Sequence, residues 1–224
     1  PAVIFGSDGI DGCQHSVFEI LSNSIDEARE GYGKKITVTR YSDGSIEVED
    51  HGRGIPVDYN ENEKRYNWEL VFTDIDIQPE YFLDIMKRQA IVNAGIEFVF
   101  RNQNGKSFDT TSYNYVNGIV DHVAEVVGEN GLSSIQHWET EVKTRDRDDK
   151  PEYKCKMDIS VAFSNKVHLT EYYHNSSWLE HGGAPDKAVR NAFVYQIDSY
   201  LKQNNKYNKT ESKIKYDDVE DSLV

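Results

Sequence analysis

A line of polar side chains runs along a predicted helix near the start of the chain. His15, Glu19, Asn23 and Glu27 recur at four-residue intervals, and Asp26 stands beside them. This spacing places side chains on one face of an α-helix, about one turn apart. Carboxylate and amide oxygens in register can hold a hard cation and can take a proton from water. The pattern indicates metal-nucleotide chemistry, with a solvated helix face as the alternative.

The composition of this helix favours the chemical interpretation over the solvated face. Asn23 lies in mid-helix, where asparagine is a poor helix former, and Ser22 and Ser24 flank it. The sequence has no lysine or arginine between Glu19 and Ala28. A face built only for solubility usually mixes charges of both signs, because oppositely charged neighbours stabilise the helix. A face of acids and amides suits a cation.

The stretch IEVEDHGRGIP, residues 46–56, could supply a second part of the same site. Ile46, Val48 and Asp50 share the parity of one strand face, so we expect Asp50 to point to the apolar side. A carboxylate there must accept hydrogen bonds, because burying it without partners is costly. Gly52 and Gly54 allow a sharp bend and the close approach of a flat ligand. A tight turn capped by an aspartate is the alternative.

The elements that must position these residues follow from hydrophobic periodicity and turn signals. We predict a helix over 15–30, whose apolar stripe is Val17, Leu21, Ile25 and Ala28, and a β-hairpin over 35–50. A second helix follows from Pro79 to Asn93. The other predicted elements are a strand at 96–101, a turn at 102–106, a helix at 115–127, strands within 153–164 and 167–175, a helix at 184–202, and the start of another helix within 217–224.

Composition limits the class of protein. The chain has 224 residues and a net charge of −14, so it does not attract phosphate backbones over its whole surface. The basic residues between Lys143 and Lys156 are interleaved with acids, which predicts a solvated hairpin tip. The two cysteines are far apart, so we expect neither a disulfide framework nor a metal site there. No signal peptide or transmembrane run is expected, and a reducing, cytoplasmic location fits best.

Together, the two motifs resemble the ATP-binding fold shared by gyrase B, heat-shock chaperones, sensor histidine kinases and MutL proteins. The first is similar to that family's helix signature, an acid four residues before an asparagine, with acids following. The second is similar to its Asp-x-Gly-x-Gly signature. NSIDEA, GRGIP and the later stretch YYHNSSWLEHGG resemble the gyrase B and topoisomerase IV branch in particular. A chaperone or kinase relative is the more distant alternative, because those branches lack GRGIP and YYHNSSWLEHGG.

The resemblance implies roles in catalysis for Glu19 and His15 and in metal binding for Asn23, all on the first helix. Glu19 matches the general base that activates the attacking water. Asn23 matches the residue whose side-chain oxygen holds Mg²⁺. His15, one turn before Glu19, is in a position to orient that carboxylate.

The resemblance also implies how ATP is held. Asp50 matches the acceptor of the adenine amino group, and Gly54 lies against the base. Glu27 and Arg53 form an ion pair at the pocket mouth, and Ile55 and Pro56 form its apolar lip. The complete implied cofactor-binding set is Asn23, Asp26, Glu27, Asp50, Gly52, Arg53, Gly54, Ile55 and Pro56.

The sequence departs from the family after about residue 72. NWELVF passes directly into TDIDIQPEYFL, where the family has a glycine-rich lid that holds the phosphates. The lid is either deleted from the chain or disordered and left out of the sequence, and both interpretations stay open. The chain also begins after the family's N-terminal arm and ends before its transducer lysine. We therefore expect weak or no ATP hydrolysis by the chain as written.

The expected fold is α+β, with a mostly antiparallel sheet covered on one face by helices. We expect an ATP-binding domain over 1–130 and part of an α/β transducer domain, with a βαβ-like element from about residue 134, over 131–224. The resemblance implies the ATPase region of a type II DNA topoisomerase, an antibiotic target that works with a gyrase A-type subunit and DNA and dimerises with ATP. Topoisomerase IV, or a module that binds nucleotides or adenine-site inhibitors without turnover, is the alternative. No membrane partner is expected.

Overall fold

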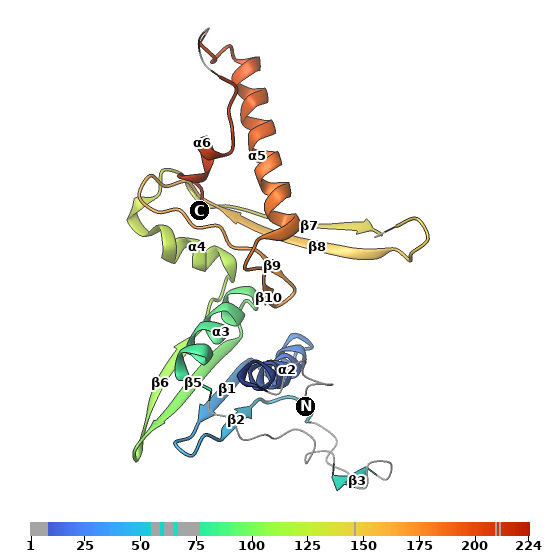
Figure 1. Ribbon diagram of the computed structural model, residues 1–224, viewed down its shortest axis with the longest axis vertical. Coiled ribbons are helices and arrows are strands. Elements are labelled where there is room, and N and C mark those ends of the chain that lie inside the picture. The colour runs from blue at the N-terminus through green and yellow to red at the C-terminus, as the bar shows by residue number, and fades with distance from the viewer. Residues whose placement is uncertain are drawn as a thin grey trace. The chain divides into compact units, whose positions relative to one another are not determined.

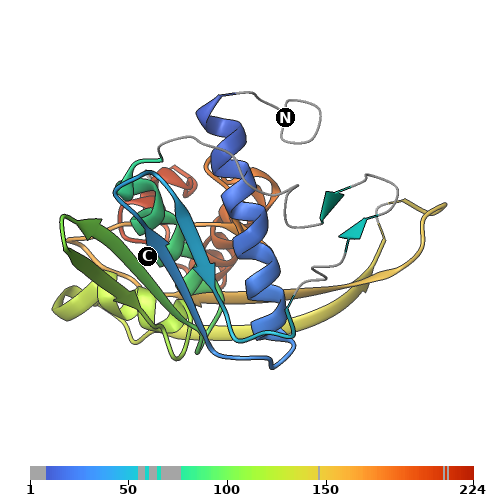
Figure 2. The same ribbon diagram turned by 90° about the horizontal axis from the view of Figure 1, so that it is seen from below.

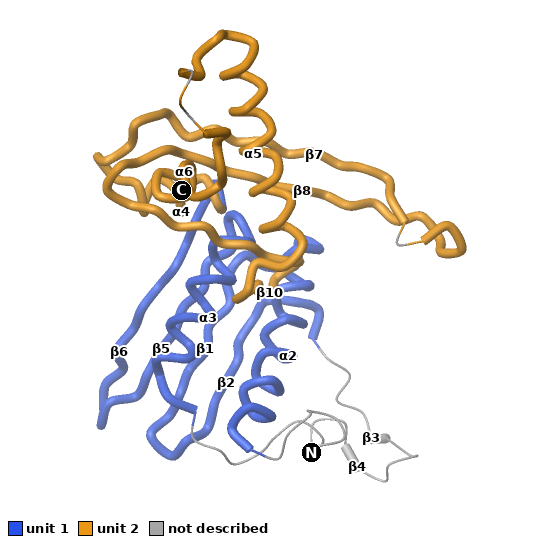
Figure 3. Tube along the Cα trace, turned by 45° about the horizontal axis from the view of Figure 1, so that its top comes forward, with its two compact units in different colours: residues 1–118 blue, residues 119–224 orange. Residues whose placement is uncertain are grey.

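The computed structural model of the chain divides into two compact units, residues 1–118 and 119–224 (Figure 3). The structure describes residues 9–54, 59–60, 65–66, 77–145, 147–208, 210 and 212–224. The boundary between the units precedes residue 130, the end predicted for the ATP-binding domain, so α4 belongs to the second unit. No helix within these described ranges is long and apolar enough to cross a membrane.

The first unit contains a four-stranded sheet and two long helices (Figure 1). The sheet has the order β2-β1-β5-β6. Only the β1–β5 pair is parallel, whereas β1–β2 and β5–β6 are antiparallel. The elements are α2 (Ile10–Arg29), β1 (Lys35–Arg40), β2 (Ile46–Glu49), the short pair β3 (Tyr59–Asn60) and β4 (Arg65–Tyr66), α3 (Pro79–Val92), β5 (Glu97–Asn104) and β6 (Ser107–Tyr113).

Strand register places both helices on the same face of this sheet. Val38 of β1 lies opposite Phe100 of β5, and the Phe100 ring stacks on Phe82 of α3 at 5.2 Å. Val38 also lies opposite Val48 of β2, so Asp50, two residues on, has the same orientation. The Ser24 hydroxyl of α2 donates to Asp50. The expected α+β fold, with helices on one face of a mostly antiparallel sheet, is confirmed.

The core of the first unit lies between this sheet face and the two helices. Leu21 and Ile25 of α2 are each 1% exposed, as the predicted apolar stripe requires. Ile36, Phe98, Phe82 and Met86 are also buried there. In Figure 2, α2 runs alongside β1 and β2, where its buried face packs. Burying a side chain of this size stabilises the fold by about 1.5–3 kcal/mol, so these contacts fix the position of α2 on the sheet.

The second unit contains hairpins and a long helix. Its elements are α4 (Ile119–Val127), a 3₁₀ turn (Gly128–Asn130), β7 (Gln136–Thr144), β8 (Tyr153–Val161), β9 (Tyr173–His174), β10 (Ser177–Trp178), α5 (Gly183–Gln203) and α6 (Asp217–Glu220). The strands pair as two antiparallel hairpins, β7–β8 and β9–β10. The expected βαβ-like element is not found among the described strands of this unit, because a βαβ element needs a parallel pair and every pair here is antiparallel. The predicted solvated tip is confirmed, since 145 and 147–152 join β7 to β8 at exposed positions.

Several predicted boundaries were wrong for identifiable reasons. The first helix starts at Ile10, five residues early, and buries Gly12 and Cys13. The helix predicted from residue 115 starts at Ile119, because Gly118 has a φ of 58° that a continuing right-handed helix cannot contain. The strand at 96–101 continues to Asn104, through the first three residues of the predicted turn.

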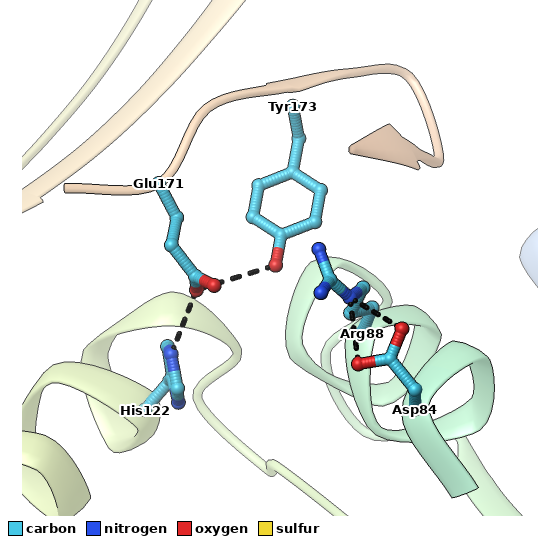
Figure 4. A network of polar contacts seen from close by, with 5 residues as sticks. All are labelled: Asp84, Arg88, His122, Glu171 and Tyr173. Atoms are coloured by element: carbon cyan, nitrogen blue, oxygen red, sulfur yellow. Dashed lines mark hydrogen bonds and ion pairs between the residues drawn. The ribbon is translucent and has the colours of Figure 1, made fainter. Parts of the chain in front are cut away.

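The strand predicted over 167–175 exists only at Tyr173–His174. Side-chain contacts hold the preceding segment instead, and Figure 4 shows them. Glu171 lies 3.0 Å from His122 of α4 and accepts a hydrogen bond from the Tyr173 hydroxyl at 3.3 Å. Figure 4 also labels Asp84 and Arg88, which form an ion pair within α3 of the first unit. The alternating pattern of 167–175 therefore reflects loop packing more than sheet pairing.

The end of the chain adds a short extended segment to the second unit. After α6, Leu223 forms an antiparallel bridge with Phe163, and Val224 exchanges two backbone hydrogen bonds with Ala162. Val224 and Ala162 pack with Val123 and Val127 of α4 in a small core. The apolar residues that follow the predicted helix start are thus strand-like and do not extend α6.

Candidate nucleotide site

Asp50 lies at the sheet edge beneath α2, where strand parity predicted it. Ile46, Val48 and Asp50 are half-buried, whereas the alternating residues Glu47 and Glu49 are exposed. Asp50 Oδ2 accepts a hydrogen bond from the Ser24 hydroxyl at 2.5 Å, and Oδ1 accepts one from the Gly52 amide at 2.8 Å. The two interpretations of Asp50 are thus compatible, because it caps the turn and also faces the core. A carboxylate offers about four acceptor positions, so it can still accept another donor.

Gly52 is required because the loop after β2 presses against α2. A Cβ atom at this position would lie 2.9 Å from Glu27 Cβ and 3.0 Å from Asp50 Oδ1. Contacts this short are forbidden, so any larger residue would push the loop away from the helix. Gly54 serves a different purpose, since its φ of 83° lies in the left-handed region that favours glycine. Gly52 therefore allows the loop to approach α2 closely, and Gly54 sets the direction of the backbone at the end of the loop.

Glu27 and Arg53 form the ion pair that the resemblance implies. Arg53 Nε donates to Glu27 Oε2 at 2.9 Å, and its Nη2 donates to Oε1 at 2.7 Å. The Arg53 backbone amide adds a third bond at 3.0 Å. The Arg53 side-chain hydrogen bonds, followed by the backbone bond, lower the pKa of Glu27 to about 2. Paired geometry of this kind orients both groups more firmly than a single contact does.

Arg53 also lies over the ring of Tyr32, with its guanidinium carbon 4.3 Å from the ring centroid. Arginine stacks well on aromatic faces, because its planar cation is attracted to the negative face of the ring. Tyr32 follows the end of α2, and its amide donates to the Glu27 carbonyl. Tyr32 and Ser24 were not predicted as site residues. For Ser24, the sequence did contain a signal of burial, because this serine is next to Ile25 of the predicted apolar stripe.

The exposed line of α2 differs from this loop. His15, Glu19 and Asn23 are all exposed, as the helical spacing predicted, and so is Asp26. His15 Nε2 lies 3.6 Å from Glu19 Oε1, which is an ion-pair distance and longer than a hydrogen bond. Asp26 lies 3.8 Å from Arg29 one turn later. The structure therefore brings Glu19 and Asn23 to one exposed face, one turn apart.

Two predicted site residues, Ile55 and Pro56, lie outside the described residues, as does the NWELVF segment. A cavity of about 380 Å³ lies elsewhere in the first unit, lined by residues 28–29, 34 and 92–96. None of the predicted site residues that the structure describes lines it. The candidate site is therefore defined by the contacts of Asp50, Gly52, Glu27 and Arg53 and by the exposed face of α2.

Known proteins resemble the chain both in sequence and in fold. A family model described as DNA gyrase B matches residues 118–224. The DNA gyrase B protein of Thermotoga maritima is 46% identical over 87 residues, which are 39% of this chain and 14% of that protein. The DNA gyrase B protein of Borreliella burgdorferi is 36% identical over 146 residues, 61% of this chain and 23% of that protein. The chain thus spans less than a quarter of the length of either relative.

A solved structure of a gyrase B domain has a fold similar to that of this chain. The 43K ATPase domain of Thermus thermophilus gyrase B, in complex with an aminocoumarin, matches with a TM-score of 0.70 and 18% identity. The match covers 100% of this chain and 77% of that domain. Identity this low shows the fold alone, but the family model and the curated relatives are independent of it. The chain is thus similar in sequence to DNA gyrase B proteins and in fold to the ATPase domain of one of them.

Proposed function

We propose that the first unit binds ATP through the loop at residues 50–54 and the exposed face of α2. The observation that supports this most directly is the environment of Asp50. Its carboxylate lies on the core face of β2, is oriented by Ser24 and Gly52, and can accept one more hydrogen bond. An adenine amino group is a donor of the right kind. Gly54 would lie against the base, where the absence of a side chain permits close approach.

The ion pair of Glu27 with Arg53 would form the mouth of this pocket. Its three hydrogen bonds tie the loop to α2, so the pair would hold the loop at a fixed distance from the helix. Ile55 and Pro56 would form the apolar lip, and Asp26 would lie beside the ligand. This assignment rests on the resemblance and on the observed ion pair.

The exposed face of α2 would serve the phosphates. Asn23 offers an amide oxygen, which is a ligand that Mg²⁺ accepts alongside phosphates and water. Bound Mg²⁺ would neutralise phosphate charge during phosphoryl transfer. Glu19, one turn away, would take the proton of the attacking water, and its exposure leaves room for that water. His15 would orient Glu19 from its position 3.6 Å away.

In the intact protein we infer an ATP-hydrolysing type II DNA topoisomerase that is cytoplasmic and acts on DNA with a gyrase A-type subunit. ATP binding would close a homodimer, and hydrolysis would reset it. The second unit would be part of the transducer domain. A topoisomerase IV B-type subunit remains the alternative for the intact protein. We expect the chain as written to bind adenine-site ligands and to hydrolyse ATP weakly or not at all.

Calorimetric titration of wild type and Asp50→Asn tests this proposal. The ligands are an aminocoumarin, the class of compound bound to the similar Thermus thermophilus domain, and Mg·ATP. Hydrogen bonds to charged groups contribute about 1.5–3 kcal/mol, so we expect the variant to bind the aminocoumarin roughly 10- to 100-fold more weakly. Glu49→Gln is the matched control, because Glu49 is the exposed neighbour on the opposite strand face.

The outcomes separate the two parts of the proposal. Loss of aminocoumarin binding in Asp50→Asn, with Glu49→Gln unchanged, supports the adenine pocket. Weak Mg·ATP binding by wild type in the same experiment would assign the phosphate contacts to the segment absent after about residue 72. Equal aminocoumarin binding by wild type and Asp50→Asn would show that Asp50 only caps its turn, and the proposal would fail.

A further inference from the structure

One face of the β7–β8 hairpin gathers three side chains that can bind a metal ion. Glu139 of β7 lies directly opposite Asp158 of β8, and His137 lies opposite Ser160. Residues two apart on a strand share a face, so His137, Glu139 and Asp158 all point to the same side. One nitrogen or oxygen of each residue lies within 4.8 Å of those of the other two. All three residues are exposed.

The imidazole lies between the two carboxylates. His137 Nδ1 is 3.4 Å from Asp158 Oδ1, and His137 Nε2 is 3.7 Å from Glu139 Oε1. The Ser160 hydroxyl lies 2.9 Å from His137 Nδ1. The antiparallel ladder spans nine residues of each strand, so the three positions are held by a continuous set of backbone pairs.

The electrostatics of this face favour a cation. Like charges directly opposite each other destabilise an antiparallel pair, and Glu139 and Asp158 are such a pair. The next carboxylate along this face, Glu141, is already paired with Lys154 at 3.0 Å. Lys156 lies opposite Glu141, two residues before Asp158 on the same strand. A divalent ion bound by both carboxylates and by the imidazole would offset the repulsion between Glu139 and Asp158.

We propose that His137, Glu139 and Asp158 form a binding site for a divalent transition-metal ion of the Zn²⁺ or Ni²⁺ type. One imidazole nitrogen and two carboxylate oxygens are a ligand set that Zn²⁺ accepts, and water can complete the coordination. Imidazole selects such ions over Mg²⁺ and Ca²⁺, which prefer oxygen ligands only. The site lies in the second unit and is independent of the proposed nucleotide chemistry. Its ligands come from one hairpin, so metal binding would crosslink β7 to β8.

The competing interpretation is an imidazolium ion that bridges two carboxylates without metal. Titration calorimetry of the 224-residue chain with Zn²⁺, and separately with Mg²⁺, distinguishes the two. We expect one Zn²⁺ per chain and no corresponding binding of Mg²⁺ at these residues. His137→Gln and Asp158→Asn should each weaken Zn²⁺ binding at least about tenfold, since even residues that only support a ligand contribute that much.

Two control variants account for binding to other surface groups. His168→Gln removes another exposed histidine of the second unit, and Glu141→Gln removes the next carboxylate along the same face. Both should bind Zn²⁺ like wild type. Glu139→Gln gives a third test of the ligand set, and circular dichroism checks that each variant is folded. Absence of Zn²⁺ binding, or binding unchanged in both His137→Gln and Asp158→Asn, would overturn the proposal and leave an ion pair only.

Discussion

The two parts of the candidate nucleotide site are built differently. The loop at residues 50–54 is fixed to α2 by the Ser24–Asp50 hydrogen bond, the close approach of Gly52 to Glu27, and the three bonds between Arg53 and Glu27. The line of His15, Glu19 and Asn23 is exposed, and His15 approaches Glu19 to 3.6 Å along it. The proposed adenine end is therefore preorganised within the first unit, whereas the proposed phosphate end depends on the ligand.

This difference has a physical cause. Discriminating a flat base requires a fixed acceptor and a fixed gap, because a misplaced polar group loses its hydrogen bond and keeps its desolvation cost. A cation and its waters can instead adjust to flexible oxygens. Four substitutions test the comparison, in order of their expected effect on the stability of the first unit.

Gly52→Ala should have the largest effect. The added Cβ would lie 2.9 Å from Glu27 Cβ, which cannot rotate away, so the loop must move. We expect the free energy of unfolding to fall by about 1–3 kcal/mol, the usual cost of overpacking, and aminocoumarin binding to weaken. Urea unfolding followed by circular dichroism measures the free energy of unfolding, and calorimetry measures aminocoumarin binding. A stable variant with wild-type binding would show that the loop is not fixed by this contact.

Ser24→Ala should have a smaller effect. The serine is 4% exposed and donates to the Asp50 carboxylate. Loss of a hydrogen bond to a charged group costs about 1.5–3 kcal/mol, and the better helix propensity of alanine returns about 0.5 kcal/mol. We therefore expect a net loss of about 1–2.5 kcal/mol in urea unfolding. Ser22→Ala, which is less buried on the same helix, is the control and should be neutral.

Glu27→Gln should lower the stability modestly at neutral pH and by less at acidic pH. The pKa of Glu27 is lowered in the folded protein from 4.5 to about 2, so its ionised form stabilises the fold above about pH 4.5. This contribution disappears as the pH falls toward 2. The ion pair is partly exposed, which limits its strength. We expect the difference in thermal midpoint between wild type and variant to shrink on acidification, and a constant difference would contradict the assignment.

Glu19→Gln should have the smallest effect on stability. Its side chain is 56% exposed, so the free energy of unfolding should change by no more than about 0.5 kcal/mol. Aminocoumarin binding should also stay unchanged, because the proposed adenine end does not use this residue. ATP hydrolysis by the intact protein should be abolished if Glu19 is the general base. A variant that retains hydrolysis would assign that role to another group.

The elements closest to the site were predicted well, since their signals are local. The helix containing Leu21 and Ile25, the hairpin of β1 and β2, and α3 beginning at Pro79 all follow from periodicity, turn residues and helix signals. The strand predicted at 167–175 failed because its pattern arises from contacts such as His122–Glu171. That contact joins residues 49 positions apart, and no local window contains both of them.

The sequence by itself determined which residues share a face. Helical spacing placed His15, Glu19 and Asn23 on one line, and strand parity turned Asp50 toward the core, because both depend on backbone geometry alone. Only the tertiary structure decided that Ser24 contacts Asp50, that Gly52 presses against Glu27, and that Arg53 stacks on Tyr32. These contacts arise when a helix and a strand end separated along the chain pack together, so their geometry depends on the whole core and not on local spacing.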